Sequence, residues 1–123
     1  FGTGTTLSTW AETYDTHEMW TSTAPSRLYA PTNGTYIVTC DAEISTVASA
    51  AEYCKTILTK TSAAVTTTIS VNLQYMGGST VRVGYSQIVR MLKADYIEYK
   101  GESDGLAVKA NVTTTRFGLA KLF

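Results

Sequence analysis

Apolar and polar residues alternate along the longest regular stretch of the chain. From position 36 every second residue is apolar: Tyr36, Val38, Cys40, Ala42 and Ile44. The residues between them are mainly polar, with Ile37 as the exception. Because strand side chains point alternately to two faces, this pattern predicts a strand over 34–45 with one face on a core and the other near water.

A turn is predicted directly before this strand. Asn33 and Gly34 both tolerate positive φ, which suits a turn. Pro31 fixes the backbone that enters the turn and keeps Ala30 extended. A short strand over 27–30 is therefore expected before the turn, and the long strand after it.

Further alternating segments are separated by turn signals. Strands are expected within 9–20, 52–60, 65–75, 81–85, 95–100, 106–112 and 116–122, and 88–92 is ambiguous. Turns are expected at 61–64, at Gly77–Gly78 and over Gly101–Gly105, and a loop over 46–51. About eight to ten short strands with this spacing predict an all-β sandwich or barrel.

Length and composition fit one packed domain. The chain has 123 residues, of which 44% are hydrophobic, so an ordinary core is expected. Residues 1–8 are rich in Gly and Thr and are interpreted as a lead-in, and 9–123 as a single domain without internal repeats. Phe1 is not a start residue, so we expect a mature or truncated product, and secretion stays open.

Charge excludes some classes of partner. The net charge is +0 and only 16% of residues are charged, which argues against nucleic-acid binding, because that requires a basic face. No apolar run approaches the ~20 residues of a membrane helix. Neither nucleic acid nor membrane is therefore expected as a partner.

Candidate chemistry is sparse. His17 lies two residues from Asp15, but no GxSxG motif supplies a nucleophile, so no catalytic residue is predicted. Two cysteines and one histidine are too few for a typical zinc site. The acidic residues within 95–104 do not have EF-hand spacing and are interpreted as a solvated turn, although a threefold axis would bring together three copies of a carboxylate. No metal and no cofactor is predicted.

The two cysteines allow two interpretations. Cys40 and Cys54 either form one disulfide or are two small buried apolar side chains. Neither belongs to a CxxC motif, so redox chemistry is not expected.

Four segments together resemble a known family. The first carries the pattern DTxxMW followed by SRLxxPxxGxY: Asp15, Thr16, Met19, Trp20, Ser26, Arg27, Leu28, Pro31, Gly34 and Tyr36. The segment 52–60 resembles a strand phrase ending in ILxNG but lacks the Asn-Gly, and 92–99 resembles LxAGDYIEI with Ala94 in place of the glycine. The segment 117–122 resembles FxGxL with the glycine displaced. In this order the set resembles the complement one-q globular head and tumour-necrosis-factor-like jelly-roll family, in its phage or bacterial branch.

The resemblance implies a jelly roll and a homotrimer. It implies that one sheet, carrying the DYIEY segment and the final strand, faces the threefold axis. Trimer contacts are therefore expected at Tyr96, Glu98, Phe117 and Leu119. For Phe117 and Leu119 a place in the core is an equally good interpretation.

The resemblance and the absence of chemical motifs favour a non-enzymatic virion structural protein. Such a protein would be a trimeric capsid decoration, head-fibre or tail-fibre domain on a phage surface, with other virion proteins as partners and a host glycan or receptor as the attachment target. The alternative is a secreted or cell-surface module of the same fold that binds carbohydrate or protein through exposed Tyr and Trp. A glycan-cleaving tail enzyme is a third possibility, but it would need a carboxylate pair in a groove.

Overall fold

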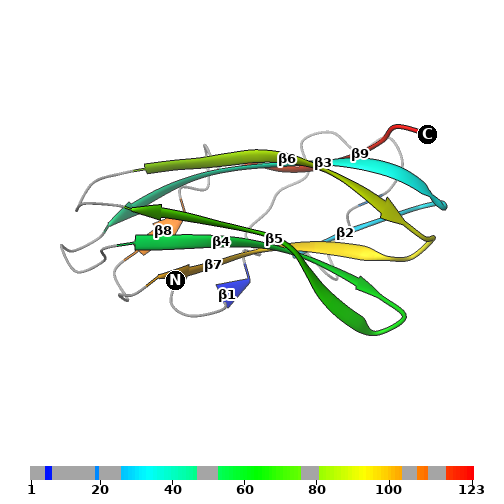
Figure 1. The fold of residues 1–123 in the computed structure, drawn as a ribbon, viewed down its shortest axis with the longest axis horizontal. Helices are drawn as coiled ribbons and strands as arrows, with labels where there is room; N and C mark the ends of the chain where they lie inside the picture. The colour runs from blue at the N-terminus through cyan, green and yellow to red at the C-terminus, as the bar shows by residue number, and fades with distance from the viewer. Residues whose placement is uncertain are drawn as a thin grey trace.

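The computed structural model describes residues 5–6, 19, 26–46, 53–75, 81–103, 108–110 and 116–123. Over these residues two antiparallel sheets pack face to face and form a two-layer sandwich (Figure 1). Both sheets contribute to one apolar core cluster between the layers. No helix that could span a membrane occurs among these residues. The prediction of an all-β sandwich is confirmed.

The chain crosses repeatedly between the two sheets. One sheet contains β1 (Thr5–Thr6), β2 (Arg27–Tyr29), β4 (Tyr53–Ser62), β5 (Val65–Tyr75) and β7 (Tyr96–Ser103). The other contains β3 (Gly34–Thr46), β6 (Val81–Met91), β8 (Val108–Ala110) and β9 (Arg116–Lys121). In the five-stranded sheet β7 lies between β4 and the short strands β1 and β2, and β5 follows β4. In the four-stranded sheet β3 lies between β6 and the strands β8 and β9.

Strand β3 carries the alternation that the sequence predicts. Its apolar residues at even positions are almost completely buried: Tyr36, Val38, Cys40, Ala42 and Ile44. At odd positions Thr39 is exposed and Ile37 is half-buried. The two faces of β3 therefore follow from the two-residue period of strand side chains.

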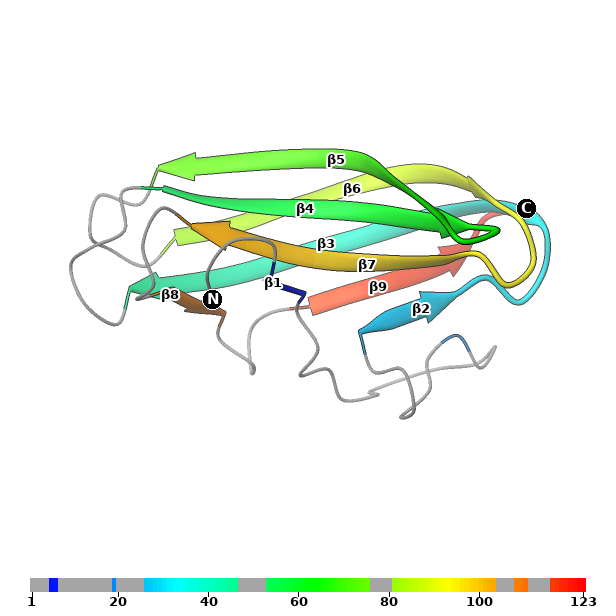
Figure 2. The same ribbon diagram turned by 90° about the horizontal axis from the view of Figure 1, so that it is seen from below.

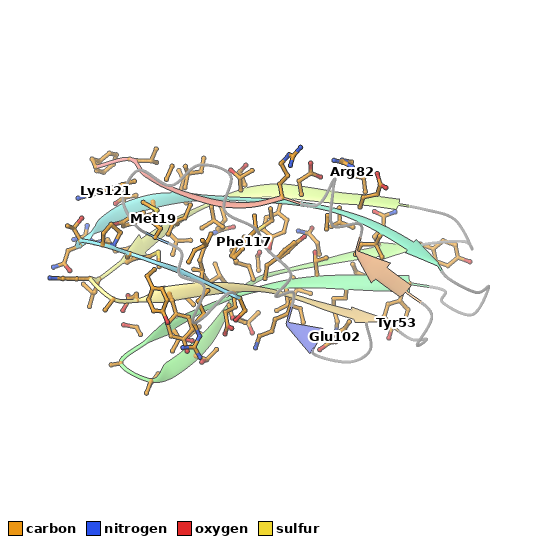
Figure 3. The ribbon with its side chains drawn as sticks, turned by 180° about the vertical axis from the view of Figure 1, so that it is seen from behind. Met19, Tyr53, Arg82, Glu102, Phe117 and Lys121 are labelled. Atoms are coloured by element: carbon orange, nitrogen blue, oxygen red, sulfur yellow. The ribbon has the colours of Figure 1, made fainter. Side chains whose placement is uncertain are left out.

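The opposite sheet completes the core with residues from β4 and β7. Leu58, Ile97 and Tyr99 are fully buried. The Tyr99 ring stacks on the Phe117 ring with centroids 5.7 Å apart and meets Tyr85 edge-on at 6.4 Å. Figure 3 shows Phe117 between the two sheets. These aromatic contacts join the layers across the middle of the sandwich.

The turn before β3 forms where predicted, but for a different reason. Neither Asn33 nor Gly34 has a positive φ, so the argument from backbone freedom is wrong. A Cβ at Gly34 would lie 2.8 Å from the Phe123 carbonyl oxygen, so this position needs glycine because the end of the chain passes close by. Asn33 contributes through its side-chain oxygen, which accepts a hydrogen bond of 2.7 Å from the backbone N–H of Lys93.

Three other segments refine the prediction. The ambiguous segment around Ile88 is the end of β6. Residues Gly101–Ser103 were predicted as a turn, which is wrong, because they pair with β4 and continue β7. Thr5–Thr6, within the predicted lead-in, form β1 and pair with β7. The Gly77–Gly78 turn and, apart from Met19, the strands expected within 9–20 lie outside the described residues.

Candidate binding surface

A cluster of aromatic and charged side chains lies on the outward face of the five-stranded sheet. Strand β2 pairs antiparallel with β7, which places Arg27 opposite Glu98 and Tyr29 opposite Tyr96. Ile97 and Tyr99, which alternate with Tyr96 and Glu98 along β7, are buried in the core. Tyr96 and Glu98 therefore point away from the core. We name Ser26, Arg27, Tyr29, Tyr96 and Glu98 the Arg27 cluster.

The aromatic half of the cluster is built around the Arg27 guanidinium. Its Cζ lies 4.2 Å from the centroid of the Tyr96 ring, which is a cation–π arrangement. The Tyr29 and Tyr96 rings are tilted by 57° with centroids 5.4 Å apart. Arg27 Nη1 also donates a hydrogen bond of 3.3 Å to the Tyr29 hydroxyl. This hydrogen bond is the largest contribution that raises the pKa of Arg27, so the guanidinium stays charged.

The acidic half of the cluster is built around the Glu98 carboxylate. Ser26 Oγ donates a hydrogen bond of 2.8 Å to Glu98 Oε2, and Arg27 Nε lies 3.8 Å from the same oxygen. The side chain of Glu98 is 15% exposed and that of Arg27 is 39% exposed. These contacts hold the Arg27 guanidinium, the two Tyr rings and the Glu98 carboxylate in a fixed arrangement, so the cluster is preorganised for binding.

A second ion pair lies on the same sheet, away from the Arg27 cluster. Lys55 Nζ and Glu102 Oε2 are 3.1 Å apart across β4 and β7. Among the described residues, no aromatic ring lies over this pair as Tyr96 lies over Arg27. The pair therefore offers a matched comparison for the role of the cluster.

The residues predicted as trimer contacts do not share one sheet. Tyr96 and Glu98 lie on β7 in the five-stranded sheet, whereas Phe117 and Leu119 lie on β9 in the four-stranded sheet. The expectation that a single sheet carries both segments is therefore wrong. Phe117 and Leu119 are partly buried and pack against the core cluster, in line with the other interpretation of the sequence. Whether any of the four contacts another copy stays a prediction.

Cys40 is a buried side chain with a free thiol in this structure. Burial raises the pKa of this thiol to about 12, and the nearby Tyr85 hydroxyl offsets part of the shift. The Cys54 side chain lies outside the described part of the chain. The Cys40–Cys54 pairing stays a prediction that the mass of the purified protein tests.

The acidic residues near β7 have separate partners. Asp95 Oδ2 accepts a hydrogen bond of 2.8 Å from the Leu92 N–H, while Glu98 and Glu102 are engaged as described above. Within the described ranges no three His, Cys, Asp or Glu side chains come together as a metal site. His17 and Asp104 lie outside those ranges.

The sequence analysis singled out two of the five residues of the cluster and did not foresee that the other three join them. Tyr96 and Glu98 were singled out, although for a different interface. Arg27 and Ser26 were noted only as part of a family phrase, and Tyr29 only as part of the short strand expected over 27–30. The missing information was the pairing of β2 with β7, since Ser26 and Glu98 are separated by 72 positions in the sequence.

Comparisons with known proteins identify the fold. No protein-family model and no curated protein matches the chain. Among solved structures, the globular domain of zebrafish complement 1qA protein superposes with a TM-score of 0.70 at 13% identity, covering 97% of this chain and 85% of that one. Murine APRIL at pH 8.0 has a TM-score of 0.64 at 11% identity, covering 80% and 71%. Eiger TNF from S. frugiperda has a TM-score of 0.65 at 13% identity, covering 85% and 68%.

These structures are jelly rolls of the tumour-necrosis-factor and complement one-q type. The predicted jelly-roll fold is confirmed by them together with the two antiparallel sheets of this chain. Because the sequence identities are only 11% to 13%, these structures show what the fold of this chain is similar to and nothing more specific.

Proposed function

We propose that this chain is a non-enzymatic jelly-roll binding module that acts as a homotrimer and contacts a protein partner through the Arg27 cluster. The observation that carries the proposal is the placement of Arg27 between Tyr29, Tyr96 and Glu98 on an outward sheet face. Tyr and Arg are the residue types enriched among the side chains that dominate binding at protein interfaces.

The geometry of the cluster favours protein over carbohydrate as the partner. Arg27 stands over the Tyr96 ring, so the guanidinium occupies a ring face on which a sugar would otherwise stack. Arg27 and Glu98 are both partly exposed. The two charged groups of such an ion pair can form hydrogen bonds to polar groups of a partner at the rim of a protein interface.

The outward face of the four-stranded sheet supports the homotrimer. In β3, Ile37 pairs with Ile88 on one side and Ala120 on the other, which gives an uncharged row. Two residues further along β3, Thr39 pairs with Ser86 on one side and with Gly118 on the other. This second row also contains only small, uncharged residues. A flat surface of this kind lets a second copy approach closely, and the family resemblance implies a threefold arrangement.

The binding proposal is tested by a screen with matched variants. The labelled wild-type chain is applied to an array of extracellular proteins and to a glycan array. A protein ligand that is lost in Arg27→Ala and retained in Lys55→Ala supports the proposal, because Lys55 carries an ion pair on the same sheet outside the cluster. A glycan ligand, or a protein ligand bound equally by both variants, contradicts it.

A virion role is the second candidate. It is motivated by the sequence pattern between Asp15 and Tyr36, which resembles that of phage members of the family. In that setting the trimer would decorate a capsid or end a fibre, and the Arg27 cluster would face a host receptor. The alternative location is secreted or extracellular. Mass spectrometry of purified particles from the source separates these locations: absence of the chain from the particles would exclude the virion role.

A further inference from the structure

The core between the two sheets contains four buried side-chain hydroxyls, those of Thr56, Ser70, Tyr85 and Tyr99. We name these four residues the hydroxyl cluster. We propose that the hydroxyl cluster is a site for buried water molecules, which bridge the hydroxyls and join the two sheets by hydrogen bonds. The site lies inside the sandwich, on the other face of β7 from the Arg27 cluster.

The hydroxyls of the cluster have no hydrogen-bond partner in the protein. Their oxygen atoms are shielded from solvent, and within the described part of the chain none of them forms a hydrogen bond. Buried hydroxyls are normally hydrogen-bonded, because an unpaired one loses the bonds to water that it makes in the unfolded chain. Four unpaired hydroxyls in one core therefore point to a partner from outside the protein.

Strand pairing brings the four residues together from both sheets. Leu58 of β4 pairs with Ser70 on one side and with Tyr99 on the other. Thr56 lies two residues from Leu58 on the same face of β4. Tyr85 comes from the opposite sheet, and its ring meets the Tyr99 ring edge-on with centroids 6.4 Å apart. The cluster therefore spans the space between the layers.

The hydroxyls lie near one another without bonding directly. Burial raises the pKa of Tyr85, and the neighbouring Ser70 hydroxyl offsets part of this rise. Burial also raises the pKa of Tyr99, and the neighbouring Thr56 hydroxyl offsets part of that rise. Polar groups that are close but not directly bonded are commonly bridged by water. Because Tyr85 and Ser70 belong to different sheets, a water between them links the layers.

The chemistry of the cluster favours water over an ion. All four side chains are hydroxyls, and burial keeps both tyrosines protonated at neutral pH. Cys40, opposite Tyr85 on β3, is also neutral, because burial raises the pKa of its thiol to about 12. An ion at this place would be buried without an opposite charge, which is costly. Hydroxyls both donate and accept hydrogen bonds, as water does.

Polar side chains continue from the cluster toward one edge of the sandwich. Strands β5 and β6 form the edges of the two sheets on this side, as Figure 2 shows. Asn72 of β5 is half-buried and pairs with the buried Thr56, so it points inward. Gln87 of β6 is half-buried and pairs with the buried Val38, so it also points inward. These amides make the surroundings of the cluster polar, and a polar site holds water where an apolar cavity stays dry.

A crystal structure at a resolution that shows ordered water tests the proposal directly. We expect electron density for water within hydrogen-bond distance of the hydroxyls of Tyr85 and Tyr99. Direct hydrogen bonds among the four hydroxyls with no water between them would overturn the proposal. A site without any such density would overturn it as well.

Urea denaturation of conservative variants gives an independent test in solution. Tyr99→Phe and Thr56→Val each remove one hydroxyl and keep the shape of the side chain. If water bridges the hydroxyls, each variant loses hydrogen bonds and its urea midpoint falls. If the hydroxyls are unpaired in a dry core, each variant loses an unfavourable buried polar group, and its midpoint rises or stays unchanged.

Thr59→Val is the matched control for Thr56→Val. Thr59 is buried on the same strand, and its hydroxyl also has no hydrogen-bond partner among the described residues. It pairs with Glu98, whose side chain points away from the core, so it lies on the other face of the sheet from the cluster. Its midpoint is expected not to fall. A midpoint that is not lowered in both cluster variants, or that is lowered equally in Thr59→Val, overturns the proposal.

Discussion

Three alanines adopt backbone conformations that usually require glycine or asparagine. Ala63 has φ of 50°, Ala64 of 65° and Ala94 of 71°. The left-handed region costs an L-residue roughly 1–2 kcal/mol, because Cβ approaches the following carbonyl oxygen. At Ala94 the turn between β6 and β7 keeps the geometry that the family-like pattern fills with glycine.

Replacing Ala94 by Gly is expected to raise the free energy of unfolding by about 0.5–1 kcal/mol, since the strain is removed and only part of the gain is offset by the freer unfolded chain. Urea denaturation measures the change. Ala120→Gly is the control: Ala120 lies in β9 without a positive φ, and glycine there should destabilise. Lower stability of Ala94→Gly would contradict the assigned conformation.

Buried hydroxyl and thiol groups determine the stability at alkaline pH. Burial raises the pKa of the Cys40 thiol to about 12 and also raises the pKa of Tyr85 and Tyr99. The folded state therefore keeps protons that the unfolded state releases. The free energy of unfolding should be unaffected below about pH 9 and should fall as the pH rises toward about 12.

Urea denaturation between pH 8 and pH 11 measures this dependence. Cys40→Ala should be less stable throughout, because it leaves a small cavity, but its stability should fall less steeply with pH than that of the wild type. Parallel curves for the two proteins would mean that Cys40 does not titrate in this range on unfolding.

Among the elements, the hairpin of β4 and β5 has an unusual turn. Ser62 pairs with Val65, so the loop consists of the two residues Ala63 and Ala64, both with positive φ. Two-residue hairpin loops of this handedness strongly prefer Asn-Gly. The double replacement Ala63→Asn with Ala64→Gly is expected to stabilise the chain by about 1 kcal/mol or more. Thermal unfolding provides the measurement, and an unchanged or lower midpoint would contradict the turn assignment.

The start of β3 is joined to the end of the chain. The backbone N–H of Thr35 donates a hydrogen bond of 2.8 Å to the Phe123 carbonyl oxygen. The backbone N–H of Leu122 donates a hydrogen bond of 2.8 Å to the Thr35 carbonyl oxygen. A side chain at Gly34 would displace this segment. Gly34→Val is expected to destabilise by about 1–3 kcal/mol, as is usual for overpacking.

Gly118→Ala provides the comparison, because a Cβ at Gly118 would have no neighbouring atom within 4 Å among the described residues of its own chain. Chemical denaturation of both variants should show a loss at Gly34 and little change at Gly118. Equal effects would mean that the close approach to Phe123 is not what makes glycine necessary at position 34.

Sequence periodicity predicted the strands, and it did not predict how they pair. The alternation around Tyr36 defined β3 and its buried face, because side-chain direction in a strand is a local property. The division of β7 and β9 between two sheets depends on contacts between distant segments, so the grouping of Tyr96 with Phe117 failed. The meeting of Arg27 with Tyr96 depends on the same kind of long-range pairing.

At the scale of the whole molecule, the outward face of the four-stranded sheet has a specific expected role. Ile88 is 63% exposed on this face, in the edge strand β6 next to β3. Ile88→Glu is expected to reduce the native mass from three chains to one, because a carboxylate would be buried without a partner between copies. Leu92→Glu serves as control, since Leu92 is exposed in the turn after β6 and should leave the mass unchanged. Loss of the trimer in both variants would show that the effect is not specific to this face.

The trimer itself is tested most directly by the native mass of the wild-type chain, measured by light scattering on a sizing column. The account predicts a stable mass of three chains over a range of concentrations. A mass of one chain would contradict the trimeric binding module and leave a monomeric jelly roll.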